Sequence, residues 1–123
     1  MTTIDLFRNT DAYATFEAGQ IVFERGQPGD VMYAVVDGEV EILLGERVID
    51  VALPGGIVGE MALIDSSPRG ATARARTLCR LVPIGERRFI FLVQQTPFFA
   101  IQVMRIMADR LRRAMASAEG VEP

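Results

Sequence analysis

Short apolar runs and turn signals alternate along the first two thirds of the chain. Between residues 19 and 83, turn-forming residues recur about every ten positions, which is typical of a β-sandwich or barrel. Residues 31–36 are apolar on both faces of a strand, which favours a central position in a sheet. Asp37-Gly38 separates this run from the apolar residues 40–44, and such a dipeptide is a strong hairpin signal. We therefore predict a β-rich domain with a hairpin at this dipeptide.

The hydrophobic period changes after Gly85. Residues 86–95 have the pattern of a short helix, and Pro97 is placed to begin a second one, because proline is tolerated in a first helical turn. In the second helix an apolar stripe follows the 3-4-3 spacing of a heptad seam, formed by Met104, Met107, Leu111 and Ala114. Such a stripe can cover the open side of the barrel, pair with a second copy of the chain, or close over a ligand.

Length, composition and charge limit the functions that the chain can have. With 123 residues, half of them hydrophobic, it is long enough for one compact domain over residues 1–123. Its net charge is −3, which suits nucleic acid poorly because phosphate binding requires a basic face. It has no histidine, which excludes Ser–His and Cys–His nucleophile systems and leaves few zinc ligands. We therefore predict a non-enzymatic protein without a metal site.

The sequence shows neither a signal peptide nor a membrane span. Residues 1–8 lack a basic head followed by an apolar run, and no apolar stretch approaches the roughly 20 residues of a membrane helix. Cys79 is the only cysteine, so no intramolecular disulfide can form, and we expect it to be a small buried hydrophobe. We expect a soluble protein of the cytoplasm.

Residues 59–72 combine groups that suit a phosphate next to a sugar. Gly59 lets a ligand approach the backbone closely, and residues 61–64 can form one helical turn whose first N–H groups attract an anion. Arg69 presents a planar guanidinium that can bind two phosphate oxygens at once. Glu60, when ionised, accepts hydrogen bonds from hydroxyl groups. By chemistry alone, an ordinary surface ion pair explains the two charged residues equally well.

The same segment resembles the phosphate-binding cassette of the cyclic nucleotide-binding domain family. Residues 59–63 and 68–72 match its two halves, residues 24–40 resemble the family's early hairpins, and residues 97–112 resemble its last helix. The family includes the catabolite activator proteins, the regulatory subunits of protein kinase A and nucleotide-gated channels. Nearly the whole chain is therefore covered by the resemblance.

The resemblance implies a mainly β fold with C-terminal helices. We expect a β-jelly-roll (double-stranded β-helix) barrel at about residues 19–84, preceded by a short N-terminal helix. Two C-terminal helices should follow at about residues 86–117. The tail after Ser117 is expected to fray.

The resemblance also implies roles in ligand binding. Glu60 would accept a hydrogen bond from the ribose 2′-hydroxyl, and Arg69 would bind the exocyclic phosphate oxygens. Backbone N–H groups near Ala62 and Ala71 would complete the phosphate site. Many family members carry Ala, Ser or Thr where this chain has Gly70, and the missing hydroxyl favours cyclic AMP over cyclic GMP. The implied ligand-binding residues are Gly59, Glu60, Met61, Ala62, Pro68, Arg69, Gly70, Ala71 and Thr72.

The last helix should supply a lid over the base, for which the candidates are Arg112, Arg113, Ala114 and Met115. Two solvated arginines and two packing residues explain these positions equally well. The resemblance implies a stand-alone bacterial sensor that signals through its C-terminal helix to an unknown protein effector. Because the family's transcription factors carry a helix-turn-helix after this helix and this sequence ends at Pro123, we expect no direct DNA binding.

Two other interpretations fit the sequence. The chain can be a ligand-independent scaffold that forms a homodimer through its C-terminal helix, which Gly70 and the apolar stripe support. It can also be a regulatory subunit whose last helix docks on a separate enzyme, channel or transporter.

Overall fold

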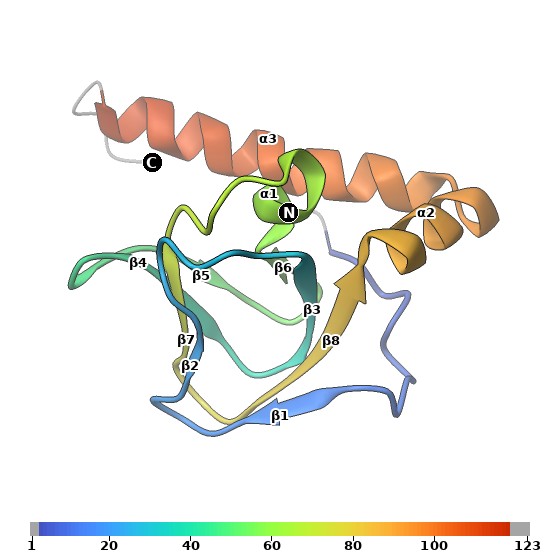
Figure 1. Cartoon of the computed structure of the whole chain (residues 1–123), viewed down its shortest axis with the longest axis horizontal. Coiled ribbons are helices and arrows are strands. Elements are labelled where there is room, and N and C mark those ends of the chain that lie inside the picture. The colour runs from blue at the N-terminus through green and yellow to red at the C-terminus, as the bar shows by residue number, and fades with distance from the viewer. Residues whose placement is uncertain (1–2, 119–123) are drawn as a thin grey trace.

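Eight strands form two antiparallel sheets that pack into a roll (Figure 1). The computed structural model describes residues 3–118. The two four-stranded sheets have the orders β1-β8-β3-β6 and β2-β7-β4-β5. Their strands are β1 (Ala14–Phe16), β2 (Ile21–Phe23), β3 (Val31–Asp37), β4 (Val40–Leu44), β5 (Arg47–Ala52), β6 (Ile57–Val58), β7 (Thr72–Ala75) and β8 (Cys79–Gly85). This arrangement confirms the predicted jelly-roll type of fold.

Three helices cover one side of the roll. The short helix α1 (Glu60–Asp65) lies between β6 and β7, and α2 (Glu86–Gln95) follows β8 directly. The long helix α3 (Phe98–Ala118) begins after Pro97, as predicted, and runs across the roll above α1 (Figure 1). The strands begin at Ala14, earlier than the expected residue 19. The tail at residues 119–123, which the sequence predicts to fray, lies outside the described residues.

The central strands are apolar on both faces because each face meets a different core. β3 pairs with β6 and β8, which confirms its predicted central position. One core lies inside the roll, and it is formed by Val35, Val40, Ala52, Val58, Ala73, Ala75, Cys79 and Leu81. The other core lies beneath the helices, and it is formed by Ile4, Phe7, Met32, Ala34, Ile57, Leu63, Val82, Ile84, Phe99, Val103 and Ile106. Alternate residues of β3 and β8 therefore join the roll to its helical cover.

The turn at Asp37-Gly38 is not the predicted hairpin. It connects β3 to β4, and these strands lie in different sheets and do not pair with each other. Gly38 has φ +85°, and a Cβ at this position would overlap the backbone of Leu78. The glycine therefore allows a tight corner between the two sheets. The same dipeptide also suits a hairpin turn, because both need a residue with positive φ. The two-residue hairpin instead joins β4 to β5, at residues 45–46.

The predicted short N-terminal helix is absent from residues 3–13, where residues 6–9 form turns. The N–H of Ile4 donates to the carbonyl oxygen of Gly55 at 2.7 Å, which fixes this segment to the turn between β5 and β6. Ile4 and Phe7 are both buried in the core beneath the helices. The burial of these two side chains and the bond to Gly55 therefore hold the segment in turns rather than in a helix.

Phe99 is the anchor of α3 in the core beneath the helices. It is fully buried, and its ring meets Phe7 edge-on at 6.1 Å between centroids and Phe89 at 5.5 Å. These contacts join the N-terminal segment, α2 and α3. The neighbouring Phe98 is 52% exposed and faces away from this core.

We predict that Phe99→Ala lowers the free energy of unfolding by about 3–5 kcal/mol, because it leaves a cavity between three elements. Urea unfolding followed by circular dichroism measures the change. The matched control is Phe98→Ala, which should cost about 0.5 kcal/mol or less because the ring is exposed. Equal losses in the two variants would contradict the anchoring role of Phe99.

Candidate ligand-binding site

Arg69 occupies a buried position between α1 and β7, with 6% of its surface exposed. Its Nη2 donates to the carbonyl oxygen of Val31 at 2.7 Å, and its Nη1 donates to that of Gly59 at 3.1 Å. The guanidinium carbon lies 4.1 Å from the centroid of the Phe23 ring. Among residues 3–118, Nε of this side chain has no hydrogen-bond partner although it is buried. A buried cation with neutral partners and one free donor is a strong site for an anion.

Two glycines leave the space that the guanidinium fills. A Cβ at Gly59 would lie 2.5 Å from Nη1 of Arg69, and a Cβ at Gly29 would overlap Nε. Gly59 also has φ +78°, a left-handed conformation that non-glycine residues rarely adopt. The side chain of Arg69 can therefore lie flat against the backbone on both sides.

α1 begins directly after Gly59, and this confirms the helical turn predicted at residues 61–64. Its first N–H groups have no partners within the helix, as at any helix start. Glu60, the first residue of α1, is 5% exposed, so its carboxylate is removed from water. A carboxylate in that position requires a cation or hydrogen-bond donors beside it.

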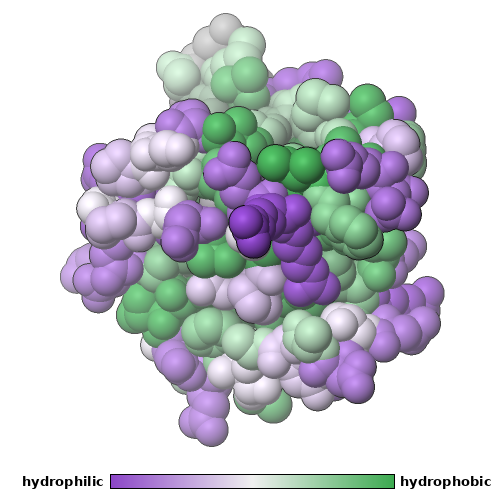
Figure 2. Space-filling view, turned by 45° about the vertical axis from the view of Figure 1, so that its right-hand side comes forward, coloured by the Kyte–Doolittle hydropathy of each residue, from purple (hydrophilic) through white to green (hydrophobic). Residues whose placement is uncertain are grey.

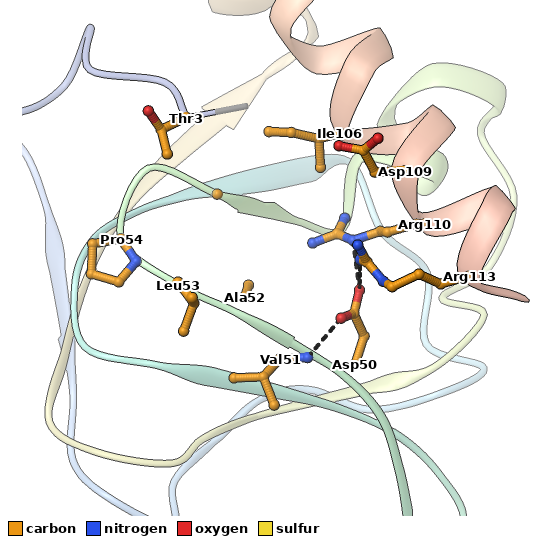
Figure 3. A pocket seen from close by; sticks show the side chains of 11 residues that line it. Thr3, Asp50, Val51, Ala52, Leu53, Pro54, Ile106, Asp109, Arg110 and Arg113 are labelled. Carbon is orange, nitrogen blue, oxygen red and sulfur yellow. Dashed lines mark hydrogen bonds and ion pairs between the residues drawn. The ribbon is translucent and has the colours of Figure 1, made fainter. Parts of the chain in front are cut away.

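Arg110 of α3 supplies that cation. Its Nη1 lies 2.5 Å from Oε1 of Glu60, and its Nη2 donates to the carbonyl oxygen of Ile57. Its Nε donates to Oδ2 of Asp50 on β5 at 3.1 Å, and Nη2 of Arg113 donates to the same oxygen at 2.9 Å (Figure 3). Glu60, Arg110, Asp50 and Arg113 thus form one chain of alternating charge between α1, β5 and α3.

Sequence reasoning missed both Arg110 and Asp50, although one signal could have found the arginine. The buried face of α3 carries Phe99, Val103 and Ile106, and continuing the 4-3 spacing leads to Arg110 and Arg113. The predicted seam at residues 104, 107, 111 and 114 is shifted from this face by one position. Met107 is half-buried against the core, while Met104, Leu111 and Ala114 are exposed.

The four lid candidates point in different directions. Arg113 faces the roll and contacts Asp50. Arg112 is largely exposed and lies 3.2 Å from Asp109 on its own helix. Ala114 and Met115 are exposed. Of the four, only Arg113 belongs to the charge chain, and the lid role stays a prediction for all of them.

The remaining cassette residues differ in how far they are buried. Ala62 is buried, Met61, Pro68 and Gly70 are exposed, and Ala71 and Thr72 are half-buried. The hydroxyl of Thr72 accepts a hydrogen bond from the N–H of Arg25 at 3.1 Å, which fixes the neighbouring loop. A Cβ at Gly70 would meet no atom within 4 Å, so the absence of a side chain there is not a steric requirement.

Burial is the main cause of two shifted pKa values, those of Arg69 and Cys79. It lowers the pKa of Arg69, and the charges of Tyr33, Asp30 and Glu60 act in the opposite direction. The ordinary pKa of arginine lies so far above neutral that the side chain stays protonated at neutral pH. Burial raises the pKa of Cys79, whose thiol donates weakly to the carbonyl oxygens of Glu39 and Thr77 at 3.2 Å. Cys79 is therefore a small buried core residue, as predicted.

A pocket opens between β5 and α3 beside the charge chain (Figure 3). Its volume of about 50 Å³ is far below the roughly 300–1,000 Å³ of typical ligand pockets. It is lined by Thr3, Asp50, Val51, Ala52, Leu53, Pro54, Gly56, Ile106, Asp109, Arg110 and Arg113. Arg69 lies outside this lining, so the pocket borders the charge chain rather than the anion site.

Residues 3–118 contain no group of three His, Cys, Asp or Glu side chains arranged to hold a metal ion. None of their helices by itself combines the length and the apolar composition that a membrane span requires.

The chain is similar to proteins of a known family. The model of the family described as "Cyclic nucleotide-binding domain" matches residues 13–96. A cyclic nucleotide-gated potassium channel of Mesorhizobium japonicum is 38% identical over 85% of this chain and 28% of its own length. A CRP-like cAMP-activated global transcriptional regulator of Mycobacterium tuberculosis is 31% identical over 80% of this chain and 46% of its own length.

The solved structures agree with the sequence relatives. The catabolite activator protein of Thermus thermophilus superposes with a TM-score of 0.74 at 28% identity, over 88% of this chain and 54% of that one. This chain spans less than half the length of the two curated relatives described above. The match of the family model over more than half of the residues shows that the chain belongs to the cyclic nucleotide-binding domain family.

Proposed function

We propose that this chain is a non-enzymatic cyclic nucleotide sensor that binds cyclic AMP in preference to cyclic GMP. The observation that carries the proposal is the buried guanidinium of Arg69, which has a free donor at Nε and only neutral carbonyl partners. A cyclic phosphate would bring one negative charge and several acceptor oxygens to this position.

The neighbouring groups suit the sugar of the same ligand. Glu60 can accept hydrogen bonds, and Arg110, whose Nη1 lies 2.5 Å from Oε1 of Glu60, can donate them. A ribose 2′-hydroxyl both donates and accepts, so it can bond to both residues. The first N–H groups of α1 and the backbone near Ala71 would add donors to the phosphate.

The preference for cyclic AMP rests on two supports. Gly70 offers no hydroxyl to a guanine base, and space for one is present, since a Cβ there would meet no atom within 4 Å. The M. tuberculosis relative is described as cAMP-activated. We extend that ligand to this chain as part of the proposal.

The proposed signal passes through α3. Arg110 binds Glu60 from this helix, so a ligand that contacts Glu60 also changes the environment of α3. In the proposed mechanism, α3 has two positions, one in the free protein and one with the nucleotide bound. The ligand then shifts α3 only by its differential affinity for the two positions. An unidentified protein effector in the bacterial cytoplasm would respond to α3, without direct DNA binding.

A homodimer through α3 is a second candidate. Met104 and Leu111 are 54% and 61% exposed and lie on one face of the helix with Ala114. Figure 2 shows, on one face of the molecule, hydrophobic residues in green that reach the surface between hydrophilic residues in purple. In the ligand-independent scaffold, this dimer would be the whole function.

We predict that the wild-type protein binds cyclic AMP more tightly than cyclic GMP. Isothermal titration calorimetry at high micromolar protein measures both affinities. An absence of binding heat with both nucleotides, checked by a thermal shift assay, would exclude the sensor function and leave the scaffold.

We predict that Arg69→Ala weakens cyclic AMP binding by about 10- to 100-fold, because it removes charge-assisted hydrogen bonds from a desolvated phosphate. The control is Arg76→Ala, since the Arg76 side chain is 54% exposed and makes only long ion pairs. Circular dichroism confirms that each variant is folded. Normal affinity in a folded Arg69→Ala protein would show that the arginine does not bind the phosphate.

We predict a dimer whose dissociation constant rises at least about tenfold in Leu111→Glu, because a charge would enter an apolar seam. Sedimentation velocity, with and without cyclic AMP, measures the assembly. A nucleotide-dependent dimer supports the sensor, and a tight dimer indifferent to nucleotide supports the scaffold. A monomer under all conditions would exclude pairing through α3.

A further inference from the structure

Asp50 lies on β5, outside the cassette, with its side chain 20% exposed. Its Oδ1 accepts a hydrogen bond from the N–H of Val51 at 2.9 Å, so the backbone of its own strand fixes the carboxylate. Its Oδ2 is thereby turned toward α3, where it accepts from Arg110 Nε and Arg113 Nη2 (Figure 3). Both carboxylate oxygens are occupied, and neither contact involves the cassette.

The bond from Asp50 determines where the rest of the Arg110 guanidinium points. A guanidinium is planar, so a hydrogen bond at Nε sets the directions of Nη1 and Nη2. With Nε on Asp50 of β5, Nη1 meets Glu60 of α1 and Nη2 meets the carbonyl oxygen of Ile57 on β6. Without the Asp50 carboxylate, Nε would lose its partner and the side chain could rotate about its last bonds.

The alternation of charges also indicates that Asp50 holds Arg110 in place. Two carboxylates, Glu60 and Asp50, alternate with two guanidiniums, Arg110 and Arg113. Glu60 is the most buried of the four, with 7% of its side chain exposed, against 20% for Asp50 and 21% for Arg110. Arg110 thus lies between two carboxylates. The more exposed one, Asp50, holds the guanidinium in place beside the more buried one, Glu60.

We propose that Asp50 is a positioning residue that, through Nε of Arg110, sets the Glu60–Arg110 pair for recognition of the sugar 2′-hydroxyl. The inference rests on the proposed function, because it assigns that pair to the sugar of the nucleotide. A hydroxyl can donate to Glu60 and accept from Arg110 at once, whereas a hydrogen atom in its place can do neither. Asp50 therefore contributes to the preference for ribose over deoxyribose without contacting the ligand.

The test compares the affinities of cyclic AMP and 2′-deoxy-cyclic AMP. We expect the wild-type protein to prefer cyclic AMP by about tenfold or more, because the deoxy ligand leaves a desolvated pair unsatisfied. In Asp50→Asn the preference should fall at least about threefold, since the amide keeps the size but loses the charge and replaces one of the two accepting oxygens with an NH2 donor. The matched control is Asp109→Asn on α3, which removes a carboxylate that contacts Arg112 and not Arg110. Its preference should equal that of the wild type.

The outcomes separate this inference from the proposed function. If the wild type prefers cyclic AMP and Asp50→Asn keeps the full preference, Asp50 does not position the pair. If the wild type binds both ligands equally, the pair does not recognise the hydroxyl, and the inference fails while the phosphate site stands. If the wild type binds neither ligand, the proposed function itself fails.

A second measurement needs no nucleotide. In ¹⁵N NMR spectra of the free protein, the Nε–H of Arg110 should exchange slowly with water because Asp50 holds it. The exchange should be at least about tenfold faster in Asp50→Asn, or in Asp50→Ser if the first variant does not fold. Equal protection in wild type and variant would overturn the inference.

Discussion

The orientation of α3 on the roll depends on the hydrogen bonds and ion pairs of the Arg110 guanidinium. Its three nitrogens meet Asp50 of β5, Ile57 of β6 and Glu60 of α1, so one side chain of α3 joins three elements. The helix is also held by apolar burial at Phe99, Val103 and Ile106, but that attraction has no direction. The charged contacts add the orientation, because a planar fork with fixed donors accepts only one arrangement of acceptors.

The anion site follows a different physical rule. Arg69 is desolvated, and its only hydrogen-bond partners in residues 3–118 are carbonyl oxygens. A buried cation without a counter-charge costs free energy, and that cost falls when an anion arrives. Gly29 and Gly59 make the burial possible, since a Cβ at either position would meet the guanidinium. The roll thus keeps the charge of Arg69 out of water, at the position that we propose for the phosphate.

The prediction for α3 shows how far periodicity can lead. The heptad spacing correctly indicated a long amphipathic helix, but it selected residues 104, 107, 111 and 114 rather than the buried face one position away. The true face ends in Arg110 and Arg113, and a hydrophobicity pattern does not count arginines as buried. The predicted hairpin at Asp37-Gly38 was wrong because the local signal fits two structures. A glycine with positive φ can form a corner between two sheets as well as a hairpin turn.

The sequence by itself determined the class of fold and the helical turn after Gly59, and it singled out Glu60 and Arg69 as candidate ligand-binding residues, because each depends on local spacing or on a short motif. The tertiary structure alone decided which partners these residues have. Asp50 and Arg110 are 60 positions apart, and Glu60 and Arg110 are 50 apart, so no local pattern connects them. A buried carboxylate requires a cation beside it, but only the packing of α3 on the roll decides which arginine provides that cation.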